Sequence, residues 1–226
     1  MPNTMFRINR FLPKSQLTNT RFMSLLTTES QSFVVSRFIP YKYSAVYEII
    51  ADIDSYSKFL PYCLHSEVTK KSLPDPNGKS WPSEANLKVG WGGIEESFTS
   101  RVFCLPGSIV EALGGEAATS LPKDKLAHHI NTIDAPALPN NIFRSLRTRW
   151  MVKSAENGLP FPDRQEMAIN RPENPGTEVH LSLDFQFSNP LYSLVSKSMA
   201  PKVAGMMIEA FETRARLLLE RQIMDR

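Results

Sequence analysis

The side chains that could do chemistry are few and widely spaced. His128 and His129 are adjacent, and Asp134 follows in the same segment, a set that would suit a metal ion if its members converged. Neighbouring side chains in an extended or looped segment usually point apart, so we interpret this set as a solvated loop and predict no metal site. His65 and His180 are isolated, and we expect each on the wet face of its strand.

The sequence carries none of the usual catalytic signatures. It has no Gly-x-Ser-x-Gly, no His-Glu-x-x-His, no phosphate-binding glycine loop and no Cys-x-x-Cys. Cys63 and Cys104 are too few for a disulfide framework or a structural zinc site, so we predict free thiols in a reducing compartment. Gly90, Gly92 and Gly93 mark a bulge or turn. The usual catalytic signatures are therefore missing from the sequence.

The carboxylate of Glu96 has two possible interpretations. It shares strand parity with Phe98 and Val102, which predicts that it points inward. Either it is hydrated near the end of a sheet, or it is a polar group that meets a ligand inside a cavity. Both interpretations stay open at this point.

The elements that would position these residues are clearest near the C-terminus. Apolar and polar residues alternate over 177–187, which predicts a half-buried strand. From Pro201 the period becomes helical over about 20 residues. The expected apolar stripe consists of Val203, Met206, Met207, Ala210, Phe211 and Leu218. Gly205 interrupts the helix, either to admit a ligand or to allow close packing on a sheet.

The rest of the chain supplies strands and two loops. Further strands are predicted at 32–39, 64–71, 85–91, 95–104, 109–113 and 143–152. After the first strand we expect a helix capped by Ser44, then a short helix ended by Pro61. Residues 116–140 and 156–176 are rich in proline and read as long surface loops. The order predicts an α+β fold, an antiparallel sheet of about seven strands curled around the C-terminal helix.

Charge separates the N-terminus from the rest. Residues 1–28 contain Arg7, Arg10, Lys14 and Arg21 and no acidic residue, the composition of a mitochondrial transit peptide, although a disordered N-terminus would look similar. Without these four, 22 Lys and Arg face 23 Asp and Glu, which excludes a broadly basic nucleic-acid-binding surface. No run of apolar residues is long enough to span a membrane.

Three stretches resemble one known family. The first stretch is near the N-terminus and comprises 36–38, 47–52, 56–63 and Ser66. The second is Glu96-Ser97-Phe98-Thr99-Ser100, and the third is Ala210-Phe211-Glu212-Thr213-Arg214-Ala215. In this pattern, and above all in Phe59-Leu60-Pro61-Tyr62-Cys63, the chain resembles the mitochondrial coenzyme Q-binding proteins of the START-like superfamily, over about 32–222. The two proline-rich segments depart from the compact pattern of that family.

The resemblance implies a helix-grip fold with an apolar cavity between sheet and helix. It also implies a protein that binds ubiquinone without catalysis and acts as its lipid chaperone or carrier on the matrix side of the mitochondrial inner membrane. Respiratory complexes or quinone-biosynthesis proteins would be its partners. Each candidate lining residue could equally be simple core; as a set they are Val89, Trp91, Glu96, Phe98, Trp150, Leu183, Phe185, Val203, Met206, Met207 and Phe211.

Two other functions occur on similar folds. A polyketide cyclase or aromatase would need acids or bases deep in the cavity, for which Glu96 alone is thin support. A protein like the bacterial ribosome-association toxins would need a basic face, which the charge balance does not favour.

A membrane surface is a further expected partner. The turn after the first helix carries Lys58, Phe59, Leu60 and Tyr62, apolar groups beside a positive charge that could meet anionic headgroups. The alternative is that these aromatic residues only cap the end of the sheet.

Overall fold

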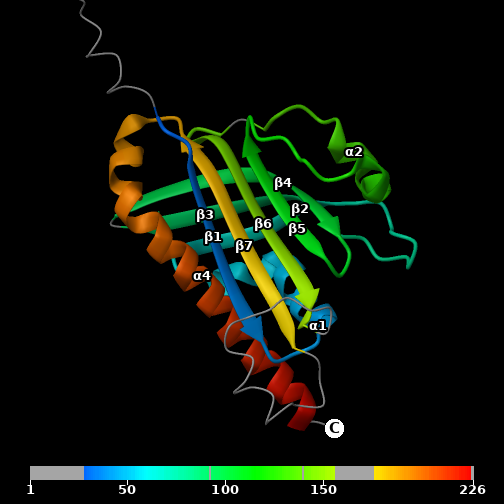
Figure 1. Ribbon diagram of the computed structural model, residues 1–226. Helices are drawn as coiled ribbons and strands as arrows, with labels where there is room; N and C mark the ends of the chain where they lie inside the picture. Colours follow the sequence, from blue (N-terminus) through cyan, green and yellow to red (C-terminus); the bar gives the residue numbers. More distant parts are fainter. Residues whose placement is uncertain (1–27, 92, 139, 156–175, 225–226) are drawn as a thin grey trace, which may run out of the picture.

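A seven-stranded sheet organises the described part of the chain. The computed structural model describes residues 28–91, 93–138, 140–155 and 176–224. Its strands lie in the order β1-β7-β6-β5-β4-β3-β2, and every neighbouring pair is antiparallel. The long helix α4 runs obliquely past β1 and β7 (Figure 1). The predicted architecture of an antiparallel sheet with a covering C-terminal helix is therefore confirmed.

The strands follow the alternation in the sequence closely. They are β1 (Gln31–Ile39), β2 (Cys63–Lys71), β3 (Pro82–Trp91), β4 (Ile94–Leu105), β5 (Ile109–Gly115), β6 (Phe143–Ser154) and β7 (Thr177–Phe187). In β7, Val179, Leu181 and Phe185 are buried toward α1 and α4, whereas His180 and Ser182 point to the opposite side. We call the side facing the two helices the inner face and the other side the outer face.

The first helices agree with the prediction except at the cap. Helix α1 (Tyr43–Ala51) is followed by the 3-10 helix η2 (Ile53–Lys58). Ser44 lies inside the first turn of α1; the capping position is Lys42, which makes no side-chain hydrogen bond there. The cap prediction was wrong because a serine at the start of an apolar period is equally compatible with the first turn.

Helix α4 (Pro190–Met224) is much longer than predicted. It has 35 residues and begins at Pro190, not at Pro201. Proline is favoured in the first turn of a helix, so either Pro190 or Pro201 could mark the start of α4 in the sequence. Pro201 has no N–H to donate to the preceding turn, so a bend is expected there, and the axis of α4 changes direction in its orange N-terminal part (Figure 1).

The segment 116–140 is not a solvated loop. It contains η3 (Lys123–His129) and α2 (Ile130–Ile133), and it covers the outer face of β4 and β5. The buried residues of this second core are Phe103, Leu113, Ala117, Leu121 and Leu126. The apolar residues of this segment are too sparsely spaced to show a period, although three of them, Ala117, Leu121 and Leu126, are buried. Residues 156–175, the other predicted loop, lie outside the described part of the chain.

Polar groups fasten this covering segment to the sheet. Arg101 of β4 donates to the carbonyl oxygens of Ala117 and Ala135, at 2.8 and 2.9 Å. Glu111 of β5 is fully buried, accepts from Arg149 Nε at 2.8 Å and from Thr119 Oγ1 at 2.6 Å. Because a buried carboxylate is costly unless paired, this network identifies the outer face as structural.

Candidate functional site

The inner face of the sheet divides into two ends. One end lies against α1, η2 and the C-terminal half of α4 and is closely packed. The ring centroid of Phe211 lies 4.4 Å from that of Trp150, 5.0 Å from Phe59 and 5.2 Å from Tyr56. We call this region the packed end.

The other end is lined by aromatic side chains that are not fully covered. Leu146 and Phe185 are buried there, with half-buried side chains packed against them: Phe33, Phe98, Phe143, Leu183 and Phe187. Ring centroids are 5.0 Å apart for Phe143 and Phe187 and 5.6 Å for Phe98 and Phe143. We call these seven residues the aromatic patch. These half-buried rings leave apolar surface on the inner face that a ligand could cover.

The buried stripe of α4 differs from the predicted one. It consists of Ala204, Ile208, Phe211, Ala215 and Leu219. Met206, predicted to face the sheet, is 39% exposed, whereas Val203 and Met207 are half-buried on the flank of the stripe. The sequence prediction assigned the larger apolar residues to the buried stripe and left out Ala204 and Ala215. Small residues are favoured where a helix approaches a sheet closely, so the stripe is rotated from its expected place.

The predicted lining residues fall into both ends. Trp150 and Phe211 belong to the packed end, with Met207 packed against it. Phe98, Leu183 and Phe185 belong to the aromatic patch. Val89 is half-buried on β3 and is paired in register with Glu96. The side chain of Trp91 lies outside the described part of the structure.

Glu96 does not stand alone. Its Oε1 accepts a hydrogen bond of 3.0 Å from the hydroxyl of Tyr192, in the first turn of α4. The ring of Tyr192 lies 5.7 Å from that of Phe187, so the polar pair borders the aromatic patch. The hydrogen bond and the negative charge of Glu96 raise the pKa of the Tyr192 hydroxyl. Sequence reasoning missed Tyr192 because it placed the start of the helix after this residue.

The turn predicted to touch a membrane is partly core. Leu60 is 8% exposed, and Phe59 packs on Tyr56 and Phe211. Lys58 is exposed and Tyr62 half-buried. Tyr62 has φ 64°, and its carbonyl oxygen accepts from the N–H of Gly90 at 2.9 Å. The contacts of Phe59 and Leu60 fit the alternative that these residues cap the end of the sheet. Lys58 and Tyr62 are still accessible enough to contact a membrane surface.

Comparison with known proteins identifies the family of this chain. A model for polyketide cyclase / dehydrase and lipid transport proteins matches residues 39–212. The chain belongs to this family. The matched range runs from the end of β1 into α4, so it includes most residues of both ends of the inner face.

Relatives of this family member carry two kinds of name. The mitochondrial coenzyme Q-binding protein coq10 of Schizosaccharomyces pombe is 27% identical over 83% of this chain and 88% of its own. The protein of the same name from Eremothecium gossypii is 29% identical over 88% of this chain and 78% of its own. The ribosome association toxin RatA of Pseudomonas aeruginosa is 24% identical over 81% of this chain and 94% of its own.

A solved structure supports the fold assignment. A START superfamily protein from Mycobacterium smegmatis superposes with a TM-score of 0.53 at 14% identity, over 84% of this chain and 98% of its own. The predicted START-like fold is thus confirmed for this family member. Among its described helices, none has both the length and the apolar character required to cross a bilayer.

The histidine pair has a structural role in this family member. Both rings are buried, at 8% exposed for His128 and 0% for His129, so the prediction of a solvated loop was wrong. His129 Nε2 accepts from the N–H of Cys104 at 3.0 Å, and His128 Nε2 donates to the carbonyl oxygen of Cys104 at 2.9 Å. β3 pairs with β4 only as far as Arg101, so the two rings satisfy the free edge of β4 beyond it.

Burial controls the protonation of this region. It lowers the pKa of His129 to about 4, with a further contribution from the neighbouring His128. Burial also raises the pKa of the Cys104 thiol to about 12 and raises that of Cys63. Both cysteines are free, as predicted, and both are poor nucleophiles. Within the described residues, no three metal-binding side chains converge.

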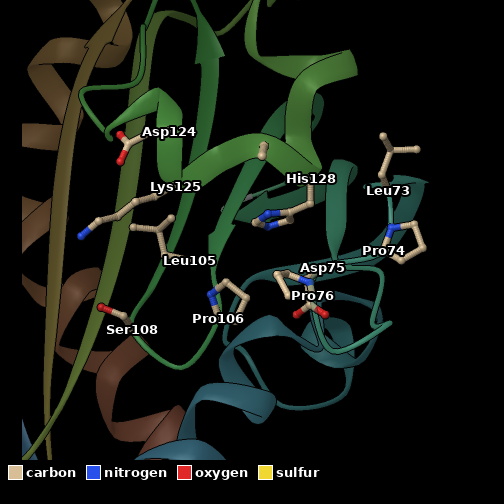
Figure 2. A pocket seen from close by; sticks show the side chains of 11 residues that line it. Leu73, Pro74, Asp75, Pro76, Leu105, Pro106, Ser108, Asp124, Lys125 and His128 are labelled. Atoms are coloured by element: carbon tan, nitrogen blue, oxygen red, sulfur yellow. The ribbon is translucent and has the colours of Figure 1, made fainter.

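A hollow of about 700 Å³ lies beside the histidine pair. Figure 2 shows it between the β2–β3 connection, the β4–β5 turn and η3, with three prolines in its lining: Pro74, Pro76 and Pro106. Its buried polar groups already have partners in the fold, since Asp75 accepts from Trp81 Nε1 at 2.9 Å and His128 donates to Cys104. We therefore place the candidate site on the inner face.

Proposed function

We propose that a groove between α4 and the inner face of the sheet binds ubiquinone, and that the protein carries the quinone at the mitochondrial inner membrane, on the matrix side. It holds the quinone without transforming it and so supports respiratory electron transport. The name of the Schizosaccharomyces pombe relative, a coenzyme Q-binding protein, supports the ligand. No catalytic residue is part of the proposal.

The observation that carries the proposal is the aromatic patch. Five of its seven side chains are half-buried although they face the helix layer. A flat, apolar quinone ring would cover them, and burying apolar surface gains roughly 25 cal/mol per Å². One polar pair at the border of an otherwise apolar surface is the usual composition of a small-molecule site.

Lipid extraction tests the proposal directly. We expect ubiquinone to co-purify with the full-length chain and to be detected by mass spectrometry of the extracted lipids. Phe98→Ser in the aromatic patch should reduce the recovered quinone severalfold. Val34→Ser is the matched control, because Val34 is 68% exposed on the outer face of β1.

Three results would contradict it. They are the absence of quinone from folded wild-type protein, equal quinone in the Phe98 and Val34 variants, and turnover of a polyketide substrate. Co-sedimentation with ribosomes in place of quinone recovery would favour the function in the name of the RatA relative.

Membrane contact is part of the proposed function. A long isoprenoid tail gains roughly 0.8 kcal/mol per buried CH₂ on leaving water, so it must stay in lipid or on the protein throughout transfer. Lys58, Tyr62 and the 50% exposed Leu64 lie on the surface of the turn and of β2, where an apolar group and a positive charge suit an anionic bilayer. This surface differs from the membrane-contact surface predicted from the sequence, which also included Phe59 and Leu60.

The last part of the proposed function is import of the chain into mitochondria. Residues 1 to about 28 would direct the chain to mitochondria, and processing near Met23 would remove most of them. Residues 1–27 lie outside the described part of the structure. N-terminal sequencing of the matrix form tests this proposal, and an intact Met1 there would contradict it.

A further inference from the structure

The polar pair at the border of the aromatic patch joins two distant elements. Tyr192 lies in the first turn of α4, and Glu96 lies near the start of β4. The hydrogen bond between them spans 96 residues of sequence. Both side chains are half-buried, so a ligand in the patch could reach them and water could replace either partner.

The surroundings of the pair are aromatic. Phe98 is two residues beyond Glu96 on the same face of β4, and Phe187 lies against the ring of Tyr192. A ring placed on the aromatic patch would therefore present an edge oxygen to this pair. Glu96 also lies opposite Val89, whose side chain cannot hydrogen-bond.

The two groups have complementary hydrogen-bonding chemistry. A quinone carbonyl oxygen only accepts hydrogen bonds, and so does a carboxylate, which means that Glu96 alone cannot hold the oxidised ring. The Tyr192 hydroxyl can donate to that carbonyl. A hydroquinone hydroxyl donates, and the Glu96 carboxylate can accept from it.

We propose, building on the function proposed above, that Tyr192 and Glu96 hold the ligand ring in both of its redox forms. Tyr192 donates to a carbonyl oxygen of the quinone, and Glu96 accepts from a hydroxyl of the hydroquinone. The 3.0 Å hydrogen bond joins the two groups to each other, and the ligand ring would take the place of one partner or the other. No electron is transferred at the site; the pair only makes binding tolerant of the redox state.

Two single-atom substitutions separate the roles. The full-length chain, delipidated, is titrated with a short-tailed ubiquinone in oxidised form and, under anaerobic conditions, in reduced form. Tyr192→Phe should weaken binding of the oxidised form about five- to tenfold, the value of one hydrogen bond, and affect the reduced form less. Glu96→Gln should weaken the reduced form by a similar factor and spare the oxidised form, because an amide can donate to a carbonyl.

Matched controls are available on exposed surfaces. Tyr43→Phe on α1 and Glu67→Gln on β2 make the same chemical changes at exposed positions outside the aromatic patch, and they should leave both affinities unchanged. Affinities are expressed per folded molecule, with the folded fraction taken from far-ultraviolet circular dichroism.

The outcomes distinguish the two proposals. If wild-type protein binds neither form, the proposed function fails and this inference with it. If wild-type protein binds both forms and the two site variants keep the wild-type ratio of affinities, the inference alone is overturned. Wild-type binding of one redox form only would also overturn it. Opposite shifts of the ratio in the two variants are the expected result.

Discussion

The two ends of the inner face use the same residue types differently. At the packed end Trp150 is 3% and Phe211 2% exposed, and α4 adds Ala204 and Ala215, so helix and sheet are in close contact. In the aromatic patch Phe98 and Phe187 are half-buried, and α4 reaches the sheet there through Tyr192. Aromatic composition alone therefore does not identify a ligand site. The degree to which the side chains are buried is what distinguishes the two ends.

The largest effect should come from truncating the packed end. Phe211→Ala removes a side chain that touches three aromatic rings, and we expect a loss of roughly 3 to 5 kcal/mol in the free energy of unfolding. Phe98→Ala, the same change in the aromatic patch, should cost about half of that or less, since less surface is buried there. Urea denaturation measures both. Equal costs would mean that the two ends are equally packed.

The second effect is acid sensitivity where the covering segment meets β4, at the back of the packed end. His129 holds the backbone of Cys104, a residue of that core, and its pKa is about 4 against 6.5 for an ordinary histidine. Between these values the unfolded chain binds the proton and the folded chain does not. Stability is therefore complete above pH 6.5 and falls as the pH drops toward 4, by about 3 kcal/mol in all.

The pH dependence has its own controls. The urea midpoint of the wild type should fall between pH 7 and pH 5. His129→Gln, whose amide oxygen can still accept from Cys104, should flatten that part of the profile. His65→Gln changes an exposed ring and should leave the profile as it is. A His129→Gln profile identical to the wild type would remove this ring as the cause.

The sequence predicted the strands well because their alternation is local. The approximate bounds of the strands and the parity of Glu96 and Phe98 follow from residue types two positions apart. The histidine pair could not be predicted, because the partner of both rings is the backbone of Cys104, a distant group without a side-chain signal. Met206 was misplaced since packing favoured alanine over a larger apolar residue on α4.

The third effect concerns the turn between η2 and β2, which touches the packed end at one side and solvent at the other. Leu60→Ala should cost about 2 kcal/mol, because the side chain is 8% exposed. Tyr62→Ser should cost little, and it should reduce flotation of the protein with cardiolipin-containing liposomes. Leu64→Ser is a second surface variant. Unchanged flotation of both surface variants would exclude this turn from membrane contact.

The smallest effect is expected at Gly205, on α4 between the two ends. A Cβ atom built there meets no other atom within 4 Å, so close packing does not explain the glycine. Gly205→Ala should raise the free energy of unfolding by up to about 1 kcal/mol, because alanine favours the helix and restricts the unfolded chain. Gly205→Leu should fold equally well and extend into the open space. If that space belongs to the groove, recovered quinone falls in the leucine variant and not in the alanine variant. Equal recovery from both would place the open space on the solvent side of α4, and the groove would then end at the aromatic patch.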